Sequence, residues 1–345
     1  MTQALRVGVV GCGIIAKRYV GDAAAFASWR PVACADLDET LAAAFAGEHG
    51  LRAEPVDDLL ADPEVDLVLS LTPPRVHAPL ARAAFAQGKH VYTEKPLGAT
   101  VAEGRELVAE AARLGLRLGC APDTFLGSVY ETARRLIAEG AIGLPLGATA
   151  TMLVGGPDSW HPNAEMFYTA GGGPVLDIAP YYLTALVSLL GPIASVAAFS
   201  ATPTPVRVLG AGPRAGTTVA VEVPTHAAAL LRLASGAIAS LTVSFEARGQ
   251  YISGLEVHGS EGSLLLPDAN AFGGELRLRR GDAEPERVAV AGYGGRETRG
   301  LGLDDLARAL REGREHRASG ELALHVLEAA DAIVRSAERG AAIDL

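Results

Sequence analysis

Residues 5–16 read Leu5-Arg6-Val7-Gly8-Val9-Val10-Gly11-Cys12-Gly13-Ile14-Ile15-Ala16. The first half is an apolar run typical of a buried strand, and the second half has the form G-x-G-x-x-A. A helical pattern then continues to about residue 26. A strand, a glycine turn and a helix in this order predict a dinucleotide-binding turn, in which backbone N–H groups at the helix N-terminus face a pyrophosphate.

The small residues of this turn each have a physical role. Gly11 permits the tight turn, Gly13 lets the backbone approach the pyrophosphate, and Ala16 lets the helix pack close to the strand. A second predicted strand ends at Asp36, 23 residues after Gly13. Its carboxylate would bind the adenosine ribose hydroxyls and repel a 2′-phosphate. Because Leu37 follows and no arginine stands beside the acid, we expect NAD as the cofactor, with NADP less favoured.

The alternation of apolar strands and helices continues to residue 122. One predicted strand ends before Thr72-Pro73-Pro74, and the next ends before Glu94-Lys95-Pro96. This alternation predicts a doubly wound parallel sheet of the Rossmann type over residues 1–122. Ligands bind at the carboxyl edge of such sheets, so Lys95 is placed to meet one. An isolated Glu-Lys-Pro, without these neighbours, is most often a solvated surface turn.

The remaining residues, 123–345, predict a second domain of the α+β type. Residues 226–234 and 237–245 flank the turn Ser235-Gly236, and the second run alternates apolar and polar side chains, which is typical of a β-hairpin. Further strand patterns follow, and helical patterns cover residues 303–311 and 321–337, where the chain could pack back on the first domain. We therefore expect a large, open, mostly antiparallel sheet with helices on one face.

A glycine-rich segment of the second domain carries two polar residues of interest. It reads Gly171-Gly172-Gly173-Pro174-Val175-Leu176-Asp177-Ile178-Ala179-Pro180-Tyr181. Asp177 and Tyr181 are four positions apart and share one face of a regular helix. Pro180 kinks such a helix unless it lies in the first turn, and Asp177 could instead cap a helix that begins just after it. A tyrosine on an apolar helix is otherwise a core residue.

The composition argues against several classes of function. The chain has 345 residues, of which 49% are hydrophobic and 20% charged, as in soluble globular proteins. Its formal charge of −10 and lack of a basic block make nucleic acid and anionic membranes poor partners. Three cysteines without a C-x-x-C pair favour reduced thiols and a cytoplasmic location. The N-terminus lacks a signal-peptide pattern, and no apolar run reaches membrane-spanning length.

These motifs resemble those of the Gfo/Idh/MocA oxidoreductases, the glucose–fructose oxidoreductase and inositol dehydrogenase family. The matching stretches are the glycine turn, Asp36, the Gly171–Tyr181 segment, Thr72-Pro73-Pro74-Arg75-Val76-His77 and Gly88-Lys89-His90-Val91-Tyr92-Thr93-Glu94-Lys95-Pro96. Pro74 stands where the family usually has asparagine, and Ala179 where it has glycine. Tyr181 replaces the usual catalytic histidine, as in the glucose–fructose oxidoreductase and dihydrodiol dehydrogenase-like branches.

The resemblance implies a set of site residues. Lys95 would point at the nicotinamide and the substrate, and the Lys95–Pro96 peptide is often cis in the family. A dimer partner usually covers the open sheet, so we expect a homodimer or homotetramer. The expected cofactor-binding residues are Gly11, Gly13, Ile14, Ile15, Asp36, Thr72, Pro73, His77, Glu94 and Lys95. The expected substrate contacts are Asp123, His161 and Asn163.

Some of these residues have simpler interpretations. His77 could position the turn after Thr72 instead of touching the cofactor, and His161 and Asn163 could belong to a solvated loop. His161, Glu165 and Asp177 lack a recognised metal-ligand spacing, so we expect no metal.

Hydride transfer from a carbinol needs a nicotinamide over the C–H bond, a base for the hydroxyl proton and a positive group for the alkoxide-like state. Lys95 could supply the charge and Tyr181 the base, or Lys95 could itself be the base, while Asp177 would orient a substrate hydroxyl. We therefore expect an NAD(P)-dependent dehydrogenase or reductase of a sugar, glycoside or cyclitol, whose two domains meet at Lys95. The alternatives are a non-catalytic NAD-binding regulator and an oxidoreductase whose cofactor never dissociates.

Overall fold

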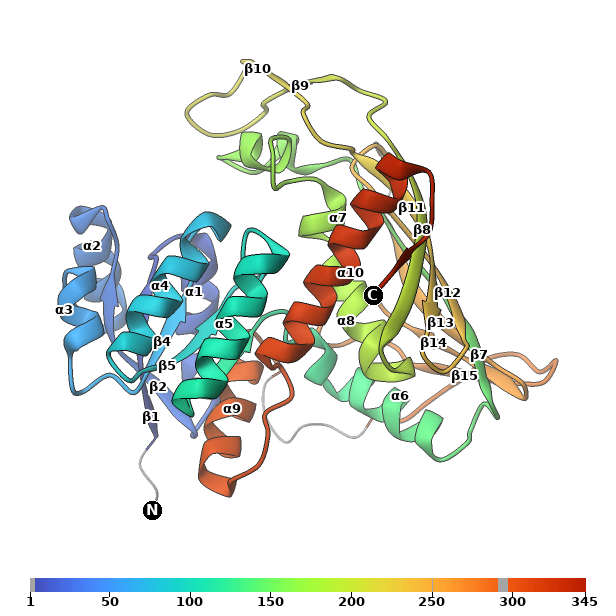
Figure 1. The fold of residues 1–345 in the computed structure, drawn as a ribbon, viewed down its shortest axis with the longest axis horizontal. Helices are drawn as coiled ribbons and strands as arrows, with labels where there is room; N and C mark the ends of the chain where they lie inside the picture. The colour runs from blue at the N-terminus through green and yellow to red at the C-terminus, as the bar shows by residue number, and fades with distance from the viewer. Residues whose placement is uncertain (1–3, 250, 291–296) are drawn as a thin grey trace. The chain divides into compact units, whose positions relative to one another are not determined.

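The computed structural model describes residues 4–249, 251–290 and 297–345, and they form two compact units. The first unit comprises Met1–Gly127 and Gly292–Leu327, and the second comprises Ser128–Ala291 and Glu328–Leu345 (Figure 1). A C-terminal segment is thus part of the first unit. The N–H groups of Gly300 and Gly302 donate to the Asp123 carboxylate there, at 3.1 and 3.0 Å.

The first unit contains a parallel six-stranded sheet within its described residues. The strand order is β3-β2-β1-β4-β5-β6, so the direction of winding reverses between β1 and β4. This order confirms the predicted Rossmann sheet, whose ligand edge lies at that reversal. The strands are β1 (Leu5–Val10), β2 (Trp29–Ala35), β3 (Arg52–Ala53), β4 (Leu67–Ser70), β5 (His90–Thr93) and β6 (Leu118–Cys120).

The helices of the first unit begin and end at recognisable caps. The Asp38 carboxylate accepts from the N–H groups of Thr40 and Leu41 at the start of α2. Thr100 caps α5 through the N–H of Glu103, and the Glu103 carboxylate returns to the N–H of Ala99, as in a capping box. The elements are α1 (Ile14–Gly21), η1 (Ala23–Ala25), α2 (Glu39–His49), α3 (Val56–Ala61), α4 (Pro74–Ala86), α5 (Val101–Leu114), η2 (Thr124–Leu126), α9 (Leu301–Glu312) and the start of α10 (Gly320–Arg339).

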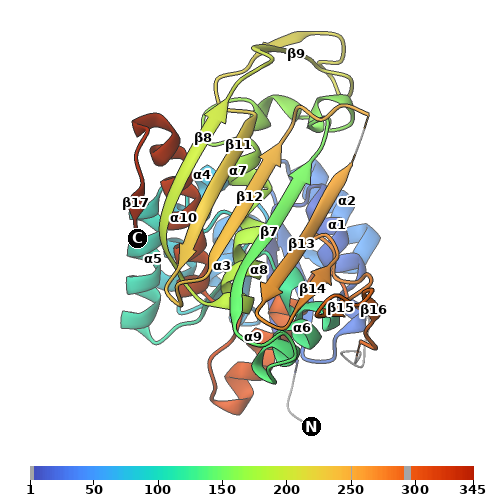
Figure 2. The ribbon, with the colours of Figure 1, turned by 90° about the vertical axis from the view of Figure 1, so that its right-hand side faces the viewer.

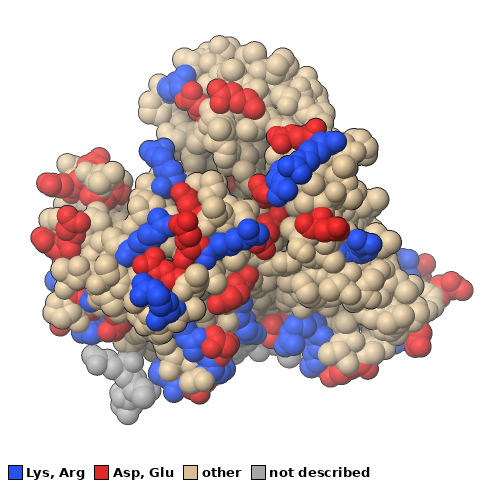
Figure 3. Space-filling model, viewed as in Figure 1, with Lys and Arg blue, Asp and Glu red and all other residues tan. Residues whose placement is uncertain are grey.

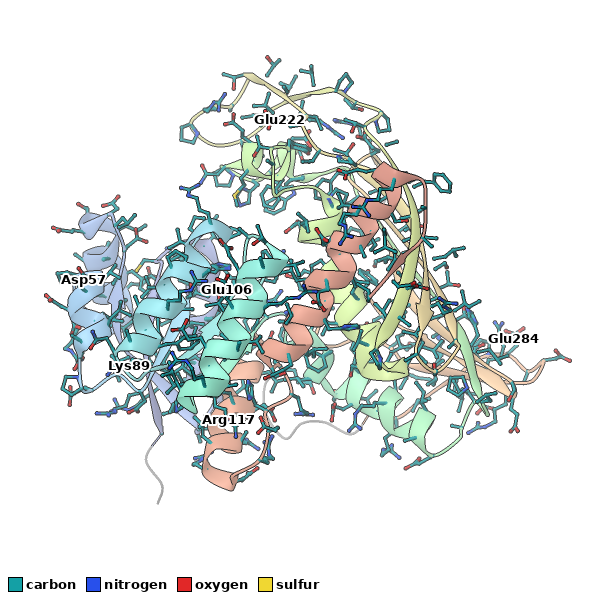
Figure 4. The ribbon with its side chains drawn as sticks, viewed as in Figure 1. Asp57, Lys89, Glu106, Arg117, Glu222 and Glu284 are labelled. Atoms are coloured by element: carbon teal, nitrogen blue, oxygen red, sulfur yellow. The ribbon has the colours of Figure 1, made fainter. Side chains whose placement is uncertain are left out.

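An apolar core joins the sheet to α4 and α5, which lie side by side in Figure 1. Its buried residues include Val68 of β4, Val91 of β5 and Phe85 of α4. Lys89, labelled in Figure 4, is buried beside this core, and its ammonium donates to the carbonyl oxygens of Asp62 and Val65 at 2.7 and 2.8 Å. The strands thus lie in a close-packed layer that fixes the loops at their carboxyl ends.

The second unit contains a nine-stranded sheet among its described residues, in the order β16-β15-β14-β13-β7-β12-β11-β8-β17. Neighbouring strands are antiparallel except β7 and β12, which confirms a large, mostly antiparallel sheet. The strands are β7 (Pro145–Leu153), β8 (Ile193–Ala201), β11 (His226–Leu233), β12 (Ile238–Ser244), β13 (Ile252–Gly259), β14 (Gly262–Leu266), β15 (Arg277–Arg280), β16 (Glu286–Arg287) and β17 (Ile343–Asp344).

Helices cover one face of this sheet, and α8 packs on β7 and β12. Figure 2 shows the other face, where the strands lie toward the viewer. The side chains of Phe199, Leu230 and Ile238, which lie on β8, β11 and β12, are exposed. A separate two-stranded ribbon pairs β9 (Val206–Val208) with β10 (Thr218–Ala220). The remaining elements are α6 (Ser128–Ala138), η3 (Pro157–Ser159), η4 (Ala164–Phe167), α7 (Pro174–Asp177) and α8 (Ala179–Leu190).

The molecular surface in Figure 3 carries lysine and arginine side chains interspersed with aspartate and glutamate. This face therefore has no extended patch of one charge. In the described ranges, no helix combines the length and the apolar character that a membrane crossing requires.

We predict that His90 makes the first unit sensitive to mild acid. The N–H of Arg117 (Figure 4) donates to Nδ1 of His90 at 3.0 Å, so that nitrogen must be unprotonated. Burial lowers the pKa of His90, and the Arg117 charge lowers it further. The unfolded chain therefore takes up a proton at a higher pH than the folded chain, and stability falls as the pH drops through the ordinary histidine range.

The comparison is the free energy of urea unfolding at neutral and mildly acidic pH, for wild type and His90→Asn. Asparagine keeps an acceptor without titrating, so the variant should lose less stability on acidification than wild type. Equal losses in both proteins would contradict the assignment.

Candidate functional site

The glycine turn after β1 leaves a backbone surface open to a ligand. Gly11 has a φ of +96°, and a Cβ there would lie 2.7 Å from the Leu71 carbonyl oxygen, so no other residue fits without strain. A Cβ at Gly13 would meet nothing within 4 Å, and the neighbouring Ile14 side chain is 63% exposed. Ala16 is fully buried. The turn therefore has the open face and the packed inner side that a dinucleotide pyrophosphate needs.

Asp36 follows β2 and lies beside this turn. One carboxylate oxygen accepts from the N–H of Cys12 at 2.8 Å, and the other accepts from the N–H of Asp38 at 3.0 Å. The side chain is half-buried, and its neighbour Leu37 is 94% exposed. The structure thus holds a carboxylate in a fixed direction next to the open glycine turn.

His77 connects the loops that follow β4 and β5. Its Nε2 lies 2.8 Å from the Thr72 carbonyl oxygen and its Nδ1 lies 2.7 Å from the Pro96 carbonyl oxygen. The side chain is buried, at 1% exposure. Both partners are acceptors, so a ring with hydrogen on both nitrogens donates to both, whereas a neutral ring donates to one. This placement indicates a positioning role for His77.

Lys95 lies just after β5, with Glu94 between them, at the same sheet edge as the glycine turn. Its side chain is half-buried, and the Lys95–Pro96 peptide is cis, as the family resemblance implies. The preceding Glu94 accepts from the Tyr19 hydroxyl at 3.0 Å and from the N–H of Lys95 at 3.2 Å. Tyr19 is fully buried in α1, so the helix of the glycine turn and the Lys95 loop hold each other through one carboxylate.

Asp123 has a placement that does not favour the predicted substrate contact. It is fully buried and accepts from the N–H groups of Gly300 and Gly302 at the start of α9. Arg299 lies 3.5 Å from its other oxygen. Burial raises the pKa of Asp123, and the charge of Arg299 opposes that rise. These partners indicate that Asp123 holds the returning C-terminal segment.

Asp177 and Tyr181 do not belong to one regular helix. Asp177 ends α7 and Tyr181 lies in the first turn of α8, with Ile178 between the two helices. Pro180 is the physical reason, because it has no N–H to bond the carbonyl four residues earlier. It falls in the first turn of α8, where that N–H is not needed. Asp177 is half-buried and Tyr181 is 9% exposed.

His161 and Asn163 lie in the loop before α7, in the same unit as Asp177. The N–H of Asn163 donates to Nδ1 of His161 at 3.1 Å, so the neutral ring carries its hydrogen on Nε2. Burial lowers the pKa of His161, and the Asp177 charge partly opposes this. Trp160, which is 66% exposed, and Phe167 both contact the imidazole edge to face.

Each unit therefore brings together a part of the predicted site. The first unit places the glycine turn, Asp36, Thr72 and Lys95 along one sheet edge, with the loops after β4 and β5 joined by His77. In the second unit, the charge of Asp177 acts on His161 and opposes the lowering of its pKa by burial. Among the described residues, no group of three or more His, Cys, Asp and Glu side chains could hold a metal ion.

Sequence reasoning missed several residues that organise these sites. Tyr19 anchors Glu94, but an aromatic residue in an amphipathic helix looks like any core residue. Arg207 is fully buried next to Asp158 and Glu246, but an arginine in a polar segment looks like a solvated one. The nearby Gly210 and Gly212, whose backbone lies against Ser159 and Pro162, were the sequence signal that this segment packs closely on another part of the backbone.

Two protein-family models match most of the chain. Residues 5–121 match the model described as oxidoreductase family, NAD-binding Rossmann fold. Residues 130–265 match the Gfo/Idh/MocA C-terminal domain.

Full-length relatives and solved structures agree with this match. The chain is 34% identical to a dTDP-3,4-didehydro-2,6-dideoxy-alpha-D-glucose 3-reductase of Streptomyces violaceoruber, over 84% of this chain and 81% of that protein. It is 29% identical to levoglucosan dehydrogenase of Pseudarthrobacter phenanthrenivorans, over 99% and 98%. A solved levoglucosan dehydrogenase in complex with NADH and L-sorbose superposes with a TM-score of 0.85 at 26% identity, covering 99% of each chain. The open glycine turn and these matches lead to one conclusion: the chain belongs to the Gfo/Idh/MocA family of oxidoreductases.

Proposed function

We propose that the protein is an NAD-dependent dehydrogenase or reductase that acts on a hydroxyl-bearing carbon of a sugar, glycoside or cyclitol. The observation that carries this proposal is the sheet edge of the first unit. The open glycine turn follows β1 and Lys95 follows β5 at this edge, and only β4 lies between these two strands. The sugar reductase and the sugar dehydrogenase among the relatives support the substrate class.

The residues at this edge fit a dinucleotide. The open backbone at Gly13 and the N–H groups at the start of α1 would hold the pyrophosphate, and Asp36 would accept from the ribose hydroxyls. Thr72, Pro73 and Glu94 border the same edge, and His77 would act through the Thr72 carbonyl. When bound, the nicotinamide supplies or accepts the hydride.

Lys95 would stabilise the negative charge that develops on the substrate oxygen, since it follows β5 at this edge. Tyr181, in a branch of the family with tyrosine at the usual histidine position, would exchange the hydroxyl proton, unless Lys95 does so itself. Asp177 would accept a hydrogen bond from a second substrate hydroxyl. His161 would donate one from Nε2, because its Nδ1 already accepts from Asn163.

The second unit favours a neutral, polyhydroxylated substrate. Asp177 and the neutral His161 offer an acceptor and a donor, and the exposed Trp160 offers an apolar surface to a sugar ring.

The three cysteines, which are buried thiols without disulfides, support the cytoplasmic location.

Replacing Lys95 by alanine should lower kcat by about 10²–10⁴-fold while NADH binds within a few-fold of wild type. Tyr181→Phe should cause a loss of that size only if the phenol is the base. The matched control is Tyr182→Phe, because the Tyr182 hydroxyl donates to Asp268 at 2.8 Å and lies outside the proposed site. Steady-state kinetics on a panel of sugars, glycosides, cyclitols and nucleotide-linked sugars provides the measurement.

A wild-type kcat for Lys95→Ala would contradict the proposed mechanism. Tight NAD binding with no change in nicotinamide absorbance across the panel would favour the regulator, and nucleotide that co-purifies with the protein would favour a cofactor that never dissociates.

The preference for NAD over NADP is expected to depend on the Asp36 charge. Asp36→Asn keeps an oxygen for the N–H of Cys12 but removes the repulsion of a 2′-phosphate. The ratio of kcat/KM for NAD to that for NADP should fall about tenfold or more in this variant. Asp38→Asn, a change in the neighbouring helix cap, should leave the ratio as it is. A wild-type enzyme that prefers NADP would contradict this assignment.

We also propose that two copies of the chain pair through the open face of the nine-stranded sheet. The exposed side chains of Phe199, Leu230 and Ile238 lie on β8, β11 and β12, which are neighbouring strands. Exposed apolar patches of this kind on a sheet usually mark an interface. Sedimentation velocity should show a dimer that Leu230→Lys converts to monomer, or a tetramer that it converts to dimer. A monomeric wild-type protein at micromolar concentration would refute the interface.

A further inference from the structure

A fully buried arginine lies beneath the loop that carries His161 and Asn163. Arg207 is the central residue of β9, and its neighbours Val206 and Val208 are 51% and 58% exposed, so the strand alternation turns the arginine inward. Its Nη2 donates to the Phe245 carbonyl oxygen at 3.2 Å and to the Glu246 carboxylate at 2.6 Å. The side chain therefore ties β9 to the end of β12.

Arg207 also reaches the loop directly. Its Nη1 lies 3.7 Å from the Asp158 carboxylate, and its guanidinium lies 5.3 Å from the centre of the Tyr168 ring. The Tyr168 hydroxyl donates to the same Asp158 carboxylate. Asp158 and Tyr168 flank His161 and Asn163 within this loop, residues 155–173. One buried cation therefore contacts the loop on both sides of these two residues.

The Glu246 carboxylate beside Arg207 is kept ionised. Burial alone would raise the pKa of Glu246, but hydrogen bonds from Thr225 and Thr204 and the charge of Arg207 lower it. Asp158 is 4% exposed. Within the described part of the chain, Nε and Nη1 of Arg207 have no hydrogen-bond partner, so the guanidinium meets Asp158 and Tyr168 through charge and ring contact, while Nη2 makes its hydrogen bonds to Phe245 and Glu246.

The ribbon that carries Arg207, residues 202–224, packs on the loop backbone to backbone. The N–H of Gly210 donates to the Asp158 carbonyl at 2.7 Å, and the N–H of Glu222 (Figure 4) donates to the Tyr168 carbonyl at 2.8 Å. A Cβ at Gly212 would lie 2.1 Å from the Pro162 carbonyl oxygen. The ribbon and the loop therefore form one packed layer within the second unit.

The loop leads from this layer to the proposed substrate residues. Trp160 and His161 follow η3, which contains Asp158. At the other end, the N–H of Gly173 donates to the Phe167 carbonyl at 2.8 Å, and the N–H of Asp177 donates to the Gly173 carbonyl at 3.0 Å. A shift of Asp158 or Tyr168 would therefore be passed to His161, Asn163 and Asp177.

We propose that Arg207 is a positioning residue for substrate binding, which holds the 155–173 loop so that His161, Asn163 and Asp177 present a fixed hydrogen-bonding pattern to a sugar. The identity of the bound molecule rests on the function proposed above. A preformed loop avoids the entropy of ordering on binding, so its loss should weaken substrate binding more than the chemical step.

The test compares Arg207→Met with Arg214→Met on the same ribbon. Arg214 pairs with Glu165 at the surface, where its side chain is 51% exposed. Arg207→Met should raise the sugar KM about tenfold or more, with a smaller change in kcat and unchanged NADH affinity. Arg214→Met should stay within about twofold of wild type, as exposed ion pairs contribute little. Arg207→Lys, which keeps the charge, should recover part of the loss.

A second measurement follows the loop without any substrate. The chain has two tryptophans, of which Trp29 is 1% exposed and Trp160 is 66% exposed. Acrylamide quenching of fluorescence therefore reports mainly on Trp160, which Trp160→Phe verifies. Arg207→Met should change the quenching constant, and Arg214→Met should not.

The two measurements separate this proposal from the proposed function. A lower unfolding temperature with wild-type KM and wild-type quenching would make Arg207 merely structural and overturn the proposal. If wild type turns over no sugar, the proposed function fails, and the quenching comparison alone decides on the loop. Should Arg207→Met not fold, Glu246→Gln removes the partner charge at 2.6 Å and takes its place with the same expected and contradicting results.

Discussion

The two contacts of the His77 imidazole fix the part of the fold on which the proposed chemistry depends. They join the carbonyl oxygen of Thr72, after β4, to that of Pro96, after β5. These loops follow neighbouring parallel strands, and the histidine joins them to each other beyond the ends of those strands. Because Pro96 directly follows Lys95, the contact of His77 with the Pro96 carbonyl also positions the backbone of Lys95. Glu94 adds a second tie, through Tyr19, to the helix that opens the glycine turn.

The fold was largely predictable because its signals are local. The glycine turn needs Gly11 at a positive φ, and the strand before it and the helix after it identify it as a dinucleotide-binding turn. Apolar runs and period-two alternation likewise mark the strands of both sheets. The interruption at Ile178 was less predictable, because Pro180 fits either a kinked helix or the first turn of a new one. Packing of the following apolar helix on β7 and β12 selects the second arrangement.

The candidate site was predictable as a list of residues and much less as a set of roles. Asp123 was expected to contact the substrate, yet its carboxylate accepts from the N–H groups of Gly300 and Gly302, which are far along the chain. His77 could have met cofactor or backbone, and the structure shows two carbonyl partners. Arg207 gave no signal, since nothing local distinguishes a buried arginine from a solvated one. Each of these roles depends on a contact between distant segments, which periodicity and spacing do not encode.

The proposed division of labour assigns cofactor binding and Lys95 to the first unit and substrate recognition to the second. The most direct test of this account follows the hydride itself. Perdeuterated sugars and cyclitols are incubated with the protein and NAD, and the reduced nicotinamide is analysed by mass spectrometry. The account predicts NADH that carries one deuterium from a carbinol carbon of the substrate. NADH without deuterium, formed from a substrate that is turned over, would contradict hydride transfer from that carbon and with it the central claim.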